Sequence, residues 1–364
     1  MRIDRLWLIN FRNHQATEVA FDPSVTLVTG ANGQGKTNLL EGLAMLAGMK
    51  SFRGAVNEAM VLDGETTSVI RAEVSTERRT VLVELQVNTD SRSRIQVNRQ
   101  AVRRARDLAD TVRVVVFSPD DLELIKGSPS IRRGLLDDVV AGVDVEFRQH
   151  RSDLDRVLRQ RNTLLKQAGG RPNAEVDATL SVWDAKLIIA ANAVATSRDR
   201  LVHQLEPVVS EYYRALAGAD EPVLLTYEAP WREIGLEAAL AEVRRDEFRR
   251  STTLVGPHRD ELGILLNGLP ARSHASQGEQ RSLSLALRLA THQVLTDLLE
   301  DAPVVLLDDV FSELDDGRAR RLVDCLPAAQ TILTSATGTV PAGIVAGLHL
   351  EVHNGSVTDI GECS

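Results

Sequence analysis

Cysteine is almost absent from this sequence, which has only Cys325 and Cys363 among its 364 residues. Two cysteines cannot build the disulfide framework of a small secreted domain or a four-cysteine metal cluster. No run of residues is long and apolar enough for us to expect a membrane span. The N-terminus carries Asp4 and Arg5 where a signal peptide would need an apolar core. These absences predict a cytoplasmic protein.

The rest of the composition is that of a globular protein. Hydrophobic residues make up 43% of the chain and charged residues 26%, which is enough for a sizeable core. The length fits one large domain or two ordinary ones. The net charge of −9 is not typical of a nucleic-acid binder, but binding depends on where positive charges cluster rather than on their sum.

A glycine-rich loop joins an apolar run, Val25–Thr29, to a helical pattern over residues 38–46. A strand, a glycine loop, Lys-Thr and a helix in this order are the context of a phosphate-binding P-loop. The glycines permit positive φ, so that successive N–H groups and the helix N-terminus face one anion. A plain glycine-rich turn is the alternative. The predicted nucleotide-binding residues are Gly30, Ala31, Asn32, Gly33, Gln34, Gly35, Lys36 and Thr37.

Two acids, Asp308 and Asp309, follow the apolar run Val304–Leu307. A carboxylate at the end of a buried strand beside a P-loop can hold Mg²⁺, so we predict Asp308 and the hydroxyl of Thr37 as its ligands. Asp309 is then predicted to polarise the attacking water while Lys36 reaches the β- and γ-phosphates, which makes these two the predicted catalytic residues. Taken alone, the acid pair would equally well be a strand cap or a turn.

A third segment, formed by Ser276, Gln277, Gly278 and Glu279, opens a helical pattern that runs to about residue 299. A serine followed three residues later by glutamate predicts a capping box at the start of this helix. The same geometry can present N–H donors to an anion, so the pattern allows either a structural cap or a phosphate site.

These segments together resemble the motifs of ABC-type ATPases. Ser276 and Gly278 match the signature motif of that superfamily, and Glu279 matches the variant of its chromosome-maintenance and repair branch. Gln277 departs from the usual glycine. In this superfamily the signature motif completes the nucleotide site of a second subunit, so the resemblance implies that Ser276 acts in trans.

Two further segments are similar to motifs of the same branch. Ser312 and Asp315 lie just after the acid pair, where the D-loop stands. Arg12 and Asn13 belong to an Asn-Phe-Arg-Asn segment that is similar to the N-terminal motif of SMC-, Rad- and RecF-like ATPases. The arginine and asparagine contact nucleotide phosphates there, so the resemblance implies Arg12 and Asn13 as ATP ligands.

The spacing of the motifs separates the branches of the superfamily, because Ser276 lies 240 residues after Lys36. Transporter ATPases have a much shorter interval, and SMC-type proteins have a far longer one that is filled with coiled coil. Residues 117–121, 126–129 and 254–260 extend the likeness, so the chain resembles the RecF family from end to end.

That resemblance implies an α/β fold with an ABC-type P-loop ATPase core, a mixed sheet and a helical insertion. Residues 1–128 would form the P-loop lobe of the core, and residues 129–250 the helical insertion subdomain. Residues 251–364 would complete the core with the signature, the acid pair and the D-loop. Helical spacing takes over from about residue 130 and agrees with the expected insertion.

The resemblance also implies ATP and Mg²⁺ as cofactors, an ATP-dependent homodimer, and binding to duplex DNA near single-strand gaps. The RecR and RecO mediators and the RecA recombinase would be its partners in DNA repair, replication and the SOS response, in a nucleoid-associated protein. No glutamine follows the strand that ends at Phe117, and no histidine follows the one that ends at Thr334. Both departures suggest slow hydrolysis that works as a switch. A transporter ATPase subunit and an ATP-gated clamp without meaningful hydrolysis are the alternatives.

Six arginines between residues 91 and 106, with no acid among them, are the candidate DNA contacts. Aromatic residues make up only 4% of the chain and none lies among these arginines, so backbone contact to duplex DNA is favoured over stacking on single strands. A solvated basic face is the alternative. The six residues are Arg92, Arg94, Arg99, Arg103, Arg104 and Arg106.

Overall fold

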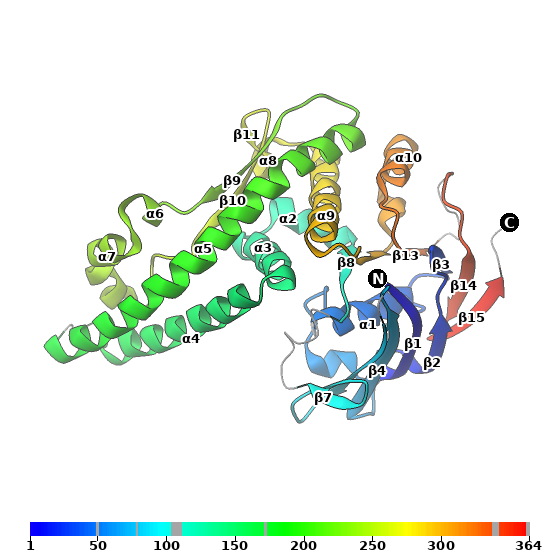
Figure 1. The fold of residues 1–364 in the computed structure, drawn as a ribbon, viewed down its shortest axis with the longest axis horizontal. Coiled ribbons are helices and arrows are strands. Elements are labelled where there is room, and N and C mark those ends of the chain that lie inside the picture. The colour runs from blue at the N-terminus through cyan, green and yellow to red at the C-terminus, as the bar shows by residue number, and fades with distance from the viewer. Residues whose placement is uncertain (49–50, 78, 103–110, 171–172, 337–341, 362–364) are drawn as a thin grey trace. The chain divides into compact units, whose positions relative to one another are not determined.

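The fold is shown in Figure 1 as a computed structural model. The structure describes residues 1–48, 51–77, 79–102, 111–170, 173–336 and 342–361. The chain divides into two compact units. The first comprises Met1–Leu122, Glu211–Asp220 and Gln277–Ser364, and the second comprises Glu123–Ser210 and Glu221–Ser276. The second unit therefore continues to Ser276, whereas the sequence-based division ended the insertion at residue 250.

The first unit contains an antiparallel sheet in the order β2-β1-β4-β5-β6-β7. Buried and partly exposed residues alternate along β4 and β5, as expected of strands with one face on a core. Its strands are β1 (Arg2–Phe11), β2 (His14–Ala20), β4 (Thr67–Ser75), β5 (Thr80–Asn88), β6 (Arg94–Val97) and β7 (Gln100–Val102).

The second sheet of this unit has the order β15-β14-β3-β13-β12-β8, and its pairs are parallel except for β14 with β15. All four residues of β12 are buried, which explains its continuous apolar sequence. The fold is thus α/β with a mixed sheet, as predicted. The strands are β3 (Val25–Thr29), β8 (Val114–Phe117), β12 (Val304–Leu307), β13 (Thr331–Ser335), β14 (Leu348–His353) and β15 (Ser356–Gly361).

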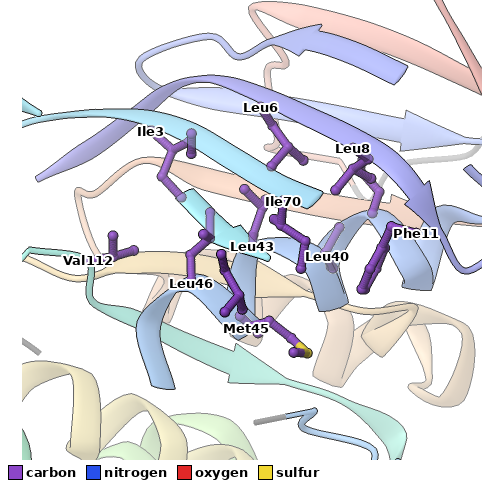
Figure 2. Close-up of a cluster of buried hydrophobic side chains, with 14 of the residues drawn as sticks. Ile3, Leu6, Leu8, Phe11, Leu40, Leu43, Met45, Leu46, Ile70 and Val112 are labelled. Atoms are coloured by element: carbon purple, nitrogen blue, oxygen red, sulfur yellow. The ribbon is translucent and has the colours of Figure 1, made fainter. Parts of the chain in front are cut away.

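The P-loop helix α1 (Lys36–Gly48) is apolar on nearly all sides and is buried in the main core of the first unit. Figure 2 shows its Leu43 and Leu46 lying among side chains of the antiparallel sheet, such as Leu6. Val28 of β3 and Leu306 of β12 belong to the same core cluster, so α1 packs against both sheets. The unit's other helical elements are η1 (Asn57–Met60), η3 (Pro119–Leu122), α9 (Gln277–Leu299), η4 (Val310–Glu313) and α10 (Asp316–Cys325).

The second unit is built mainly from helices, with a small antiparallel sheet in the order β11-β10-β9. In Figure 1 the long helices α4 and α5 run alongside each other in opposite directions, as the break at residues 169–173 predicts. Its elements are α2 (Glu123–Lys126), α3 (Pro129–Val143), α4 (Val145–Gln167), α5 (Ala174–Ala217, which ends in the first unit), β9 (Val223–Glu228), α6 (Trp231–Ile234), α7 (Leu236–Arg250), β10 (Glu261–Leu266), β11 (Leu269–Pro270) and α8 (Ala271–His274).

One helix corrects an expectation from the sequence. By length and mean hydropathy α5 could cross a membrane, although we expected no such run. The criterion is met because the helix is rich in alanine and branched apolar residues. A core helix passes the same test, and α5 also carries the buried charges Asp184 and Arg198, which are ion-paired to Arg161 and Asp137 within the second unit. These buried ion pairs show that α5 packs against protein in the second unit.

Candidate functional site

The glycine-rich loop leaves β3 and enters α1 with Gly30, Gly33 and Gly35 all at positive φ. Two of these glycines also stand where there is no room for a side chain. A Cβ on Gly30 would lie 2.3 Å from the carbonyl oxygen of Val352, and one on Gly35 would lie 2.8 Å from Oδ1 of Asn13. The loop is therefore held in the conformation in which backbone N–H groups can face an anion.

Lys36 lies over this loop. Its Nζ donates to the carbonyl oxygens of Gly30, at 2.7 Å, and of Ala31, at 3.0 Å. Burial lowers the pKa of Lys36, an effect that the nearby carboxylates of Asp309 and Asp308 oppose. A partly desolvated ammonium over a cradle of N–H groups fits the phosphates of a nucleotide.

The two predicted metal ligands lie in direct contact. Oγ1 of Thr37 donates to Oδ1 of Asp308 at 2.8 Å, and Oγ1 of Thr334 donates to the same oxygen at 3.0 Å. Burial raises the pKa of Asp308, and these two hydroxyls act against that shift. In the described part of the chain, no group of three or more His, Cys, Asp or Glu side chains is placed so that it could hold a metal ion. A hydroxyl and a single carboxylate suit Mg²⁺, which keeps waters and takes phosphate oxygens as its remaining ligands.

Asp309 adopts a left-handed backbone conformation, with φ of 49°, directly after the buried strand β12. A non-glycine residue in this region is strained, and such strain is concentrated at functional sites. The backbone N–H of Asp309 donates to Oγ1 of Thr334 at 2.9 Å. Thr334 therefore touches both acids. In the sequence, Thr334 stands out only because no histidine follows it. The pairing of β12 with β13 places it beside the two acids, and the sequence alone does not show this pairing.

Arg12 and Asn13 lie beside the P-loop with other partners than the predicted phosphates. The guanidinium of Arg12 donates through Nε and Nη2 to the two carboxylate oxygens of the buried Glu41, both at 2.9 Å. The Nε–Nη2 edge of Arg12 thus faces α1. Nδ2 of Asn13 donates to the carbonyl of Gln34 at 2.8 Å. Their contact with phosphate stays a prediction.

The predicted signature segment, Ser276, Gln277, Gly278 and Glu279, lies at the start of α9. Ser276 stands directly before Gln277, the first residue of the helix. The guanidinium of Arg318 covers Gly278, since a Cβ there would lie 2.6 Å from Nη2 of Arg318. The glycine is thus needed for this close approach.

The predicted D-loop residues contact Asp309 of the acid pair and Arg318, the arginine that covers Gly278. Oγ of Ser312 donates to the carbonyl of Asp309 at 2.7 Å. Asp315 caps α10 by accepting from the N–H of Arg318 at 2.9 Å, and its other carboxylate oxygen lies 2.8 Å from Nη1 of the same arginine. The pKa of Asp315 is lowered mainly by the hydrogen bond from the backbone of Arg318.

The described part of the arginine cluster lies on and beside β6. Arg92 precedes β6, Arg94 begins it, and Arg99 lies in the turn after it, all of them exposed. Glu84 faces Gln96 across the β5–β6 pair and binds Arg71, so the neighbouring surface carries both signs of charge. Arg103, Arg104 and Arg106 lie outside the described residues.

The chain is similar to curated proteins over nearly its whole length. It is 41% identical to the DNA replication and repair protein RecF of Streptomyces avermitilis, over 98% of this chain and 99% of the relative. It is 38% identical to the RecF protein of Acidothermus cellulolyticus, over the same shares of the two chains.

Comparison with solved structures and with family profiles agrees with this likeness. The recombination mediator protein RecF with ATP, in the RecFOR pathway, superimposes with a TM-score of 0.91 at 27% identity, over 99% of this chain and 97% of that one. The Smc head bound to the C-winged helix domain of ScpA shares the fold, with a TM-score of 0.60 at 18% identity, over 99% and 98% of the chains. The profile of the RecF/RecN/SMC N terminal domain matches residues 2–341. The chain therefore belongs to the RecF family of DNA replication and repair proteins.

Proposed function

We propose that this chain is an ATP-dependent, DNA-binding recombination mediator that acts in DNA replication and repair. One observation carries the proposal: the P-loop and the acid pair converge, with the hydroxyl of Thr37 2.8 Å from Asp308 and Lys36 over the loop carbonyls. Membership of the RecF family and the related ATP complex support ATP as the nucleotide.

ATP with Mg²⁺ supplies a phosphoanhydride bond whose hydrolysis can reset an assembly. Lys36 would provide the cation for the β- and γ-phosphates, while Thr37 and Asp308 would hold the metal. Asp309, fixed by its backbone bond to Thr334, polarises the attacking water. We propose a weak ATPase that DNA stimulates, since neither a glutamine after β8 nor a histidine after β13 is present to sense the γ-phosphate.

The proposed site is shared by two copies of the chain. Ser276 to Glu279 of one copy would meet the γ-phosphate held by the P-loop of the other, with Ser312 and Asp315 nearby in the D-loop. Binding of ATP then drives dimerisation by mass action, and hydrolysis reverses it. Within one copy, the hydroxyl of Ser312 is bound to the carbonyl of Asp309, which holds the proposed D-loop beside the acid pair.

The dimer would hold duplex DNA near single-strand gaps in the bacterial cytoplasm, in association with the nucleoid. RecR and RecO would be its direct partners in loading RecA, which places the protein in the SOS response. The related mediator of the RecFOR pathway supports this role. Arg92, Arg94 and Arg99, together with Arg103, Arg104 and Arg106, are the proposed DNA contacts.

The proposal is tested by sizing the protein with and without ATP and gapped DNA. Lys36→Met should lose both ATP binding and ATP-driven dimerisation, because the loop loses its cation. Ser276→Arg should keep ATP binding and lose only the dimer. A constant monomer of the unaltered protein under all conditions would contradict the shared site.

Measurements of DNA-stimulated ATP turnover and of membrane association distinguish the two competing interpretations. An ATP-gated clamp would dimerise with ATP but show no DNA-stimulated hydrolysis. A transporter ATPase subunit would need a membrane partner, and the interval of 240 residues between Lys36 and Ser276 argues against it.

A further inference from the structure

Two turns that are far apart in the sequence contact the P-loop at Gln34 and Gly35. One is the turn between β1 and β2, which carries Asn13 and leads into His14. The other is the turn Asn354-Gly355 between β14 and β15. All of these residues belong to the first compact unit.

Gln34 of the P-loop is bound from both turns. Its carbonyl oxygen accepts from the N–H of Gly355 at 2.9 Å and from Nδ2 of Asn13 at 2.8 Å. Its side-chain Oε1 accepts from the N–H of Asn354 at 2.7 Å. The loop conformation at this point is therefore set by atoms that do not belong to the loop.

His14 joins the two turns to the next residue of the loop. Its side chain is fully buried between two carbonyl oxygens. Nε2 lies 3.1 Å from the carbonyl of Gly35, and Nδ1 lies 2.7 Å from the carbonyl of Gly355. The hydroxyl of Thr17 also donates to the carbonyl of Gly355, at 2.8 Å. One imidazole thus spans the gap between the P-loop and the C-terminal hairpin.

The three segments interlock with no space left for side chains. A Cβ on Gly355 would lie 2.0 Å from the carbonyl oxygen of Asn13, and one on Gly35 would lie 3.0 Å from Nε2 of His14. Both glycines have positive φ, of 77° and 121°. A movement of the β14–β15 turn would therefore be passed directly to the P-loop.

We propose that the β14–β15 hairpin is a structural part of the nucleotide site, in which His14, Asn354 and Gly355 position the P-loop. The inference rests on the proposed function, namely that the loop binds ATP. These are positioning residues, because they contact the carbonyl oxygens of Gln34 and Gly35 and the side chain of Gln34. ATP affinity then depends on a turn that follows the loop by about 320 residues.

The chain offers a matched control for this turn. Asn267-Gly268 joins β10 to β11 with φ of 52° and 77°, and Asn354-Gly355 has φ of 47° and 77°. A Cβ on Gly268 would have nothing within 4 Å. Alanine at either glycine meets the same backbone strain, but only alanine at Gly355 collides with the carbonyl of Asn13.

The experiment compares Gly355→Ala with Gly268→Ala by titration with Mg²⁺-ATP and by hydrogen exchange of residues 31–37 without nucleotide. Gly355→Ala should weaken ATP binding about tenfold and speed exchange of the loop amides, because the contacts to Gln34 and His14 are displaced. Gly268→Ala should change neither. Unaltered affinity and exchange in Gly355→Ala would overturn the inference.

Two histidine variants keep the test valid if Gly355→Ala does not fold. His14→Gln retains an N–H donor between the two carbonyls, whereas His14→Leu has none. We expect His14→Leu to bind ATP about tenfold more weakly and His14→Gln to recover part of the loss. Equal affinity in both variants and the unaltered protein would overturn the inference. If Lys36→Met also binds ATP normally, the proposed function itself fails.

Discussion

At the scale of single residues, the site depends on a hydroxyl that joins the two acids after β12. Thr334 donates to Oδ1 of Asp308 and accepts from the N–H of Asp309. Asp308 is buried, so each hydrogen bond to its carboxylate counts for more than it would in water. The sequence predicted both acids from their place after an apolar run. It could not predict Thr334, because strand order decides which residue lies beside them.

Thr334→Val removes this hydroxyl at nearly constant volume. We expect Mg²⁺-dependent ATP turnover to fall about tenfold or more, since Asp308 loses a donor and the N–H of Asp309 loses its acceptor. ATP affinity should change less, because the P-loop is untouched. Steady-state turnover and equilibrium titration measure the two effects. Thr331→Val on the same strand is the control, as its hydroxyl bonds locally to the carbonyl of Ala329; an equal loss there would contradict the assignment.

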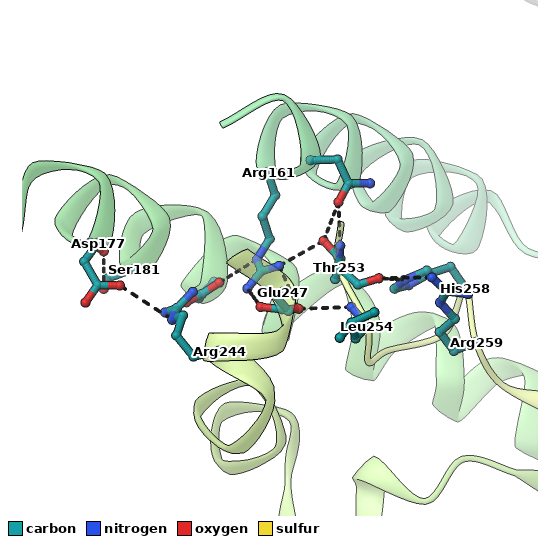
Figure 3. Close-up of polar contacts among 11 residues, drawn as sticks. Arg161, Asp177, Ser181, Arg244, Glu247, Thr253, Leu254, His258 and Arg259 are labelled. Carbon is teal, nitrogen blue, oxygen red and sulfur yellow. Dashed lines mark hydrogen bonds and ion pairs between the residues drawn. The ribbon is translucent and has the colours of Figure 1, made fainter. Parts of the chain in front are cut away.

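His258 gives the stability of the second unit a pH dependence. Burial lowers its pKa to about 4, and its Nε2 lies 3.1 Å from the carbonyl of Thr253 (Figure 3). The folded protein holds this histidine neutral, while the unfolded chain takes up a proton near the ordinary pKa of 6.5. Its contribution is therefore complete above pH 6.5 and is lost as the pH falls towards 4, with a slope of at most about 1.4 kcal/mol per pH unit.

The corresponding variant is His258→Gln, measured by urea unfolding from pH 7 to pH 4. The loss of stability across this range should become shallower, although burial also lowers the pKa of His14 and of His292 and leaves part of the slope. An identical profile for His258→Gln and the unaltered protein would contradict the assignment.

At the scale of elements, a buried ion network ties helices α4, α5 and α7 together. Arg161 of α4 is fully buried and binds Asp184 of α5 at 2.7 Å. It also binds Glu247 of α7 at 2.6 Å, a pair that Figure 3 shows. Its Nη1 also donates to Oγ1 of Thr253 at 2.9 Å. Helical periodicity located these helices but carried no sign of the network, since its members are separated by up to 92 residues.

Glu247→Gln removes one charge from this network with little change of shape. We expect the free energy of unfolding to fall by about 3–5 kcal/mol, because the positive charge of Arg161 stays buried with less compensation. Asp246→Asn, on the same helix, removes an exposed pair with Arg249 and should cost about 1 kcal/mol or less. Urea unfolding measures both, and equal values would contradict the role of burial.

The helices and strands also show how far the sequence could be interpreted. The range of β12, Val304–Leu307, was predicted as observed, because two acidic residues follow the apolar run. No strand was predicted over Ser356–Gly361, where the structure has β15, although Asn354-Gly355 is a clear hairpin signal. The pairing of Arg12 with Glu41 could not be predicted, since an arginine near a phosphate site can bind either the phosphate or a carboxylate of the protein.

At the scale of the whole molecule, we propose that one nucleotide site needs two copies of the chain. The P-loop and the acid pair come together within the first unit, while the fold and the family membership rest on the full length of the chain. Lys36 and Ser276 belong to opposite halves of the proposed shared site. Variants in these two residues should therefore complement each other.

The most direct test is to mix Lys36→Met with Ser276→Arg and to measure the molecular mass with ATP by light scattering. Each variant alone should stay monomeric. The mixture should form dimers, because the P-loop of the Ser276→Arg copy and the signature of the Lys36→Met copy make one intact site. A mixture that stays monomeric, while the unaltered protein dimerises with ATP, would contradict the shared site, as would dimers of Ser276→Arg alone.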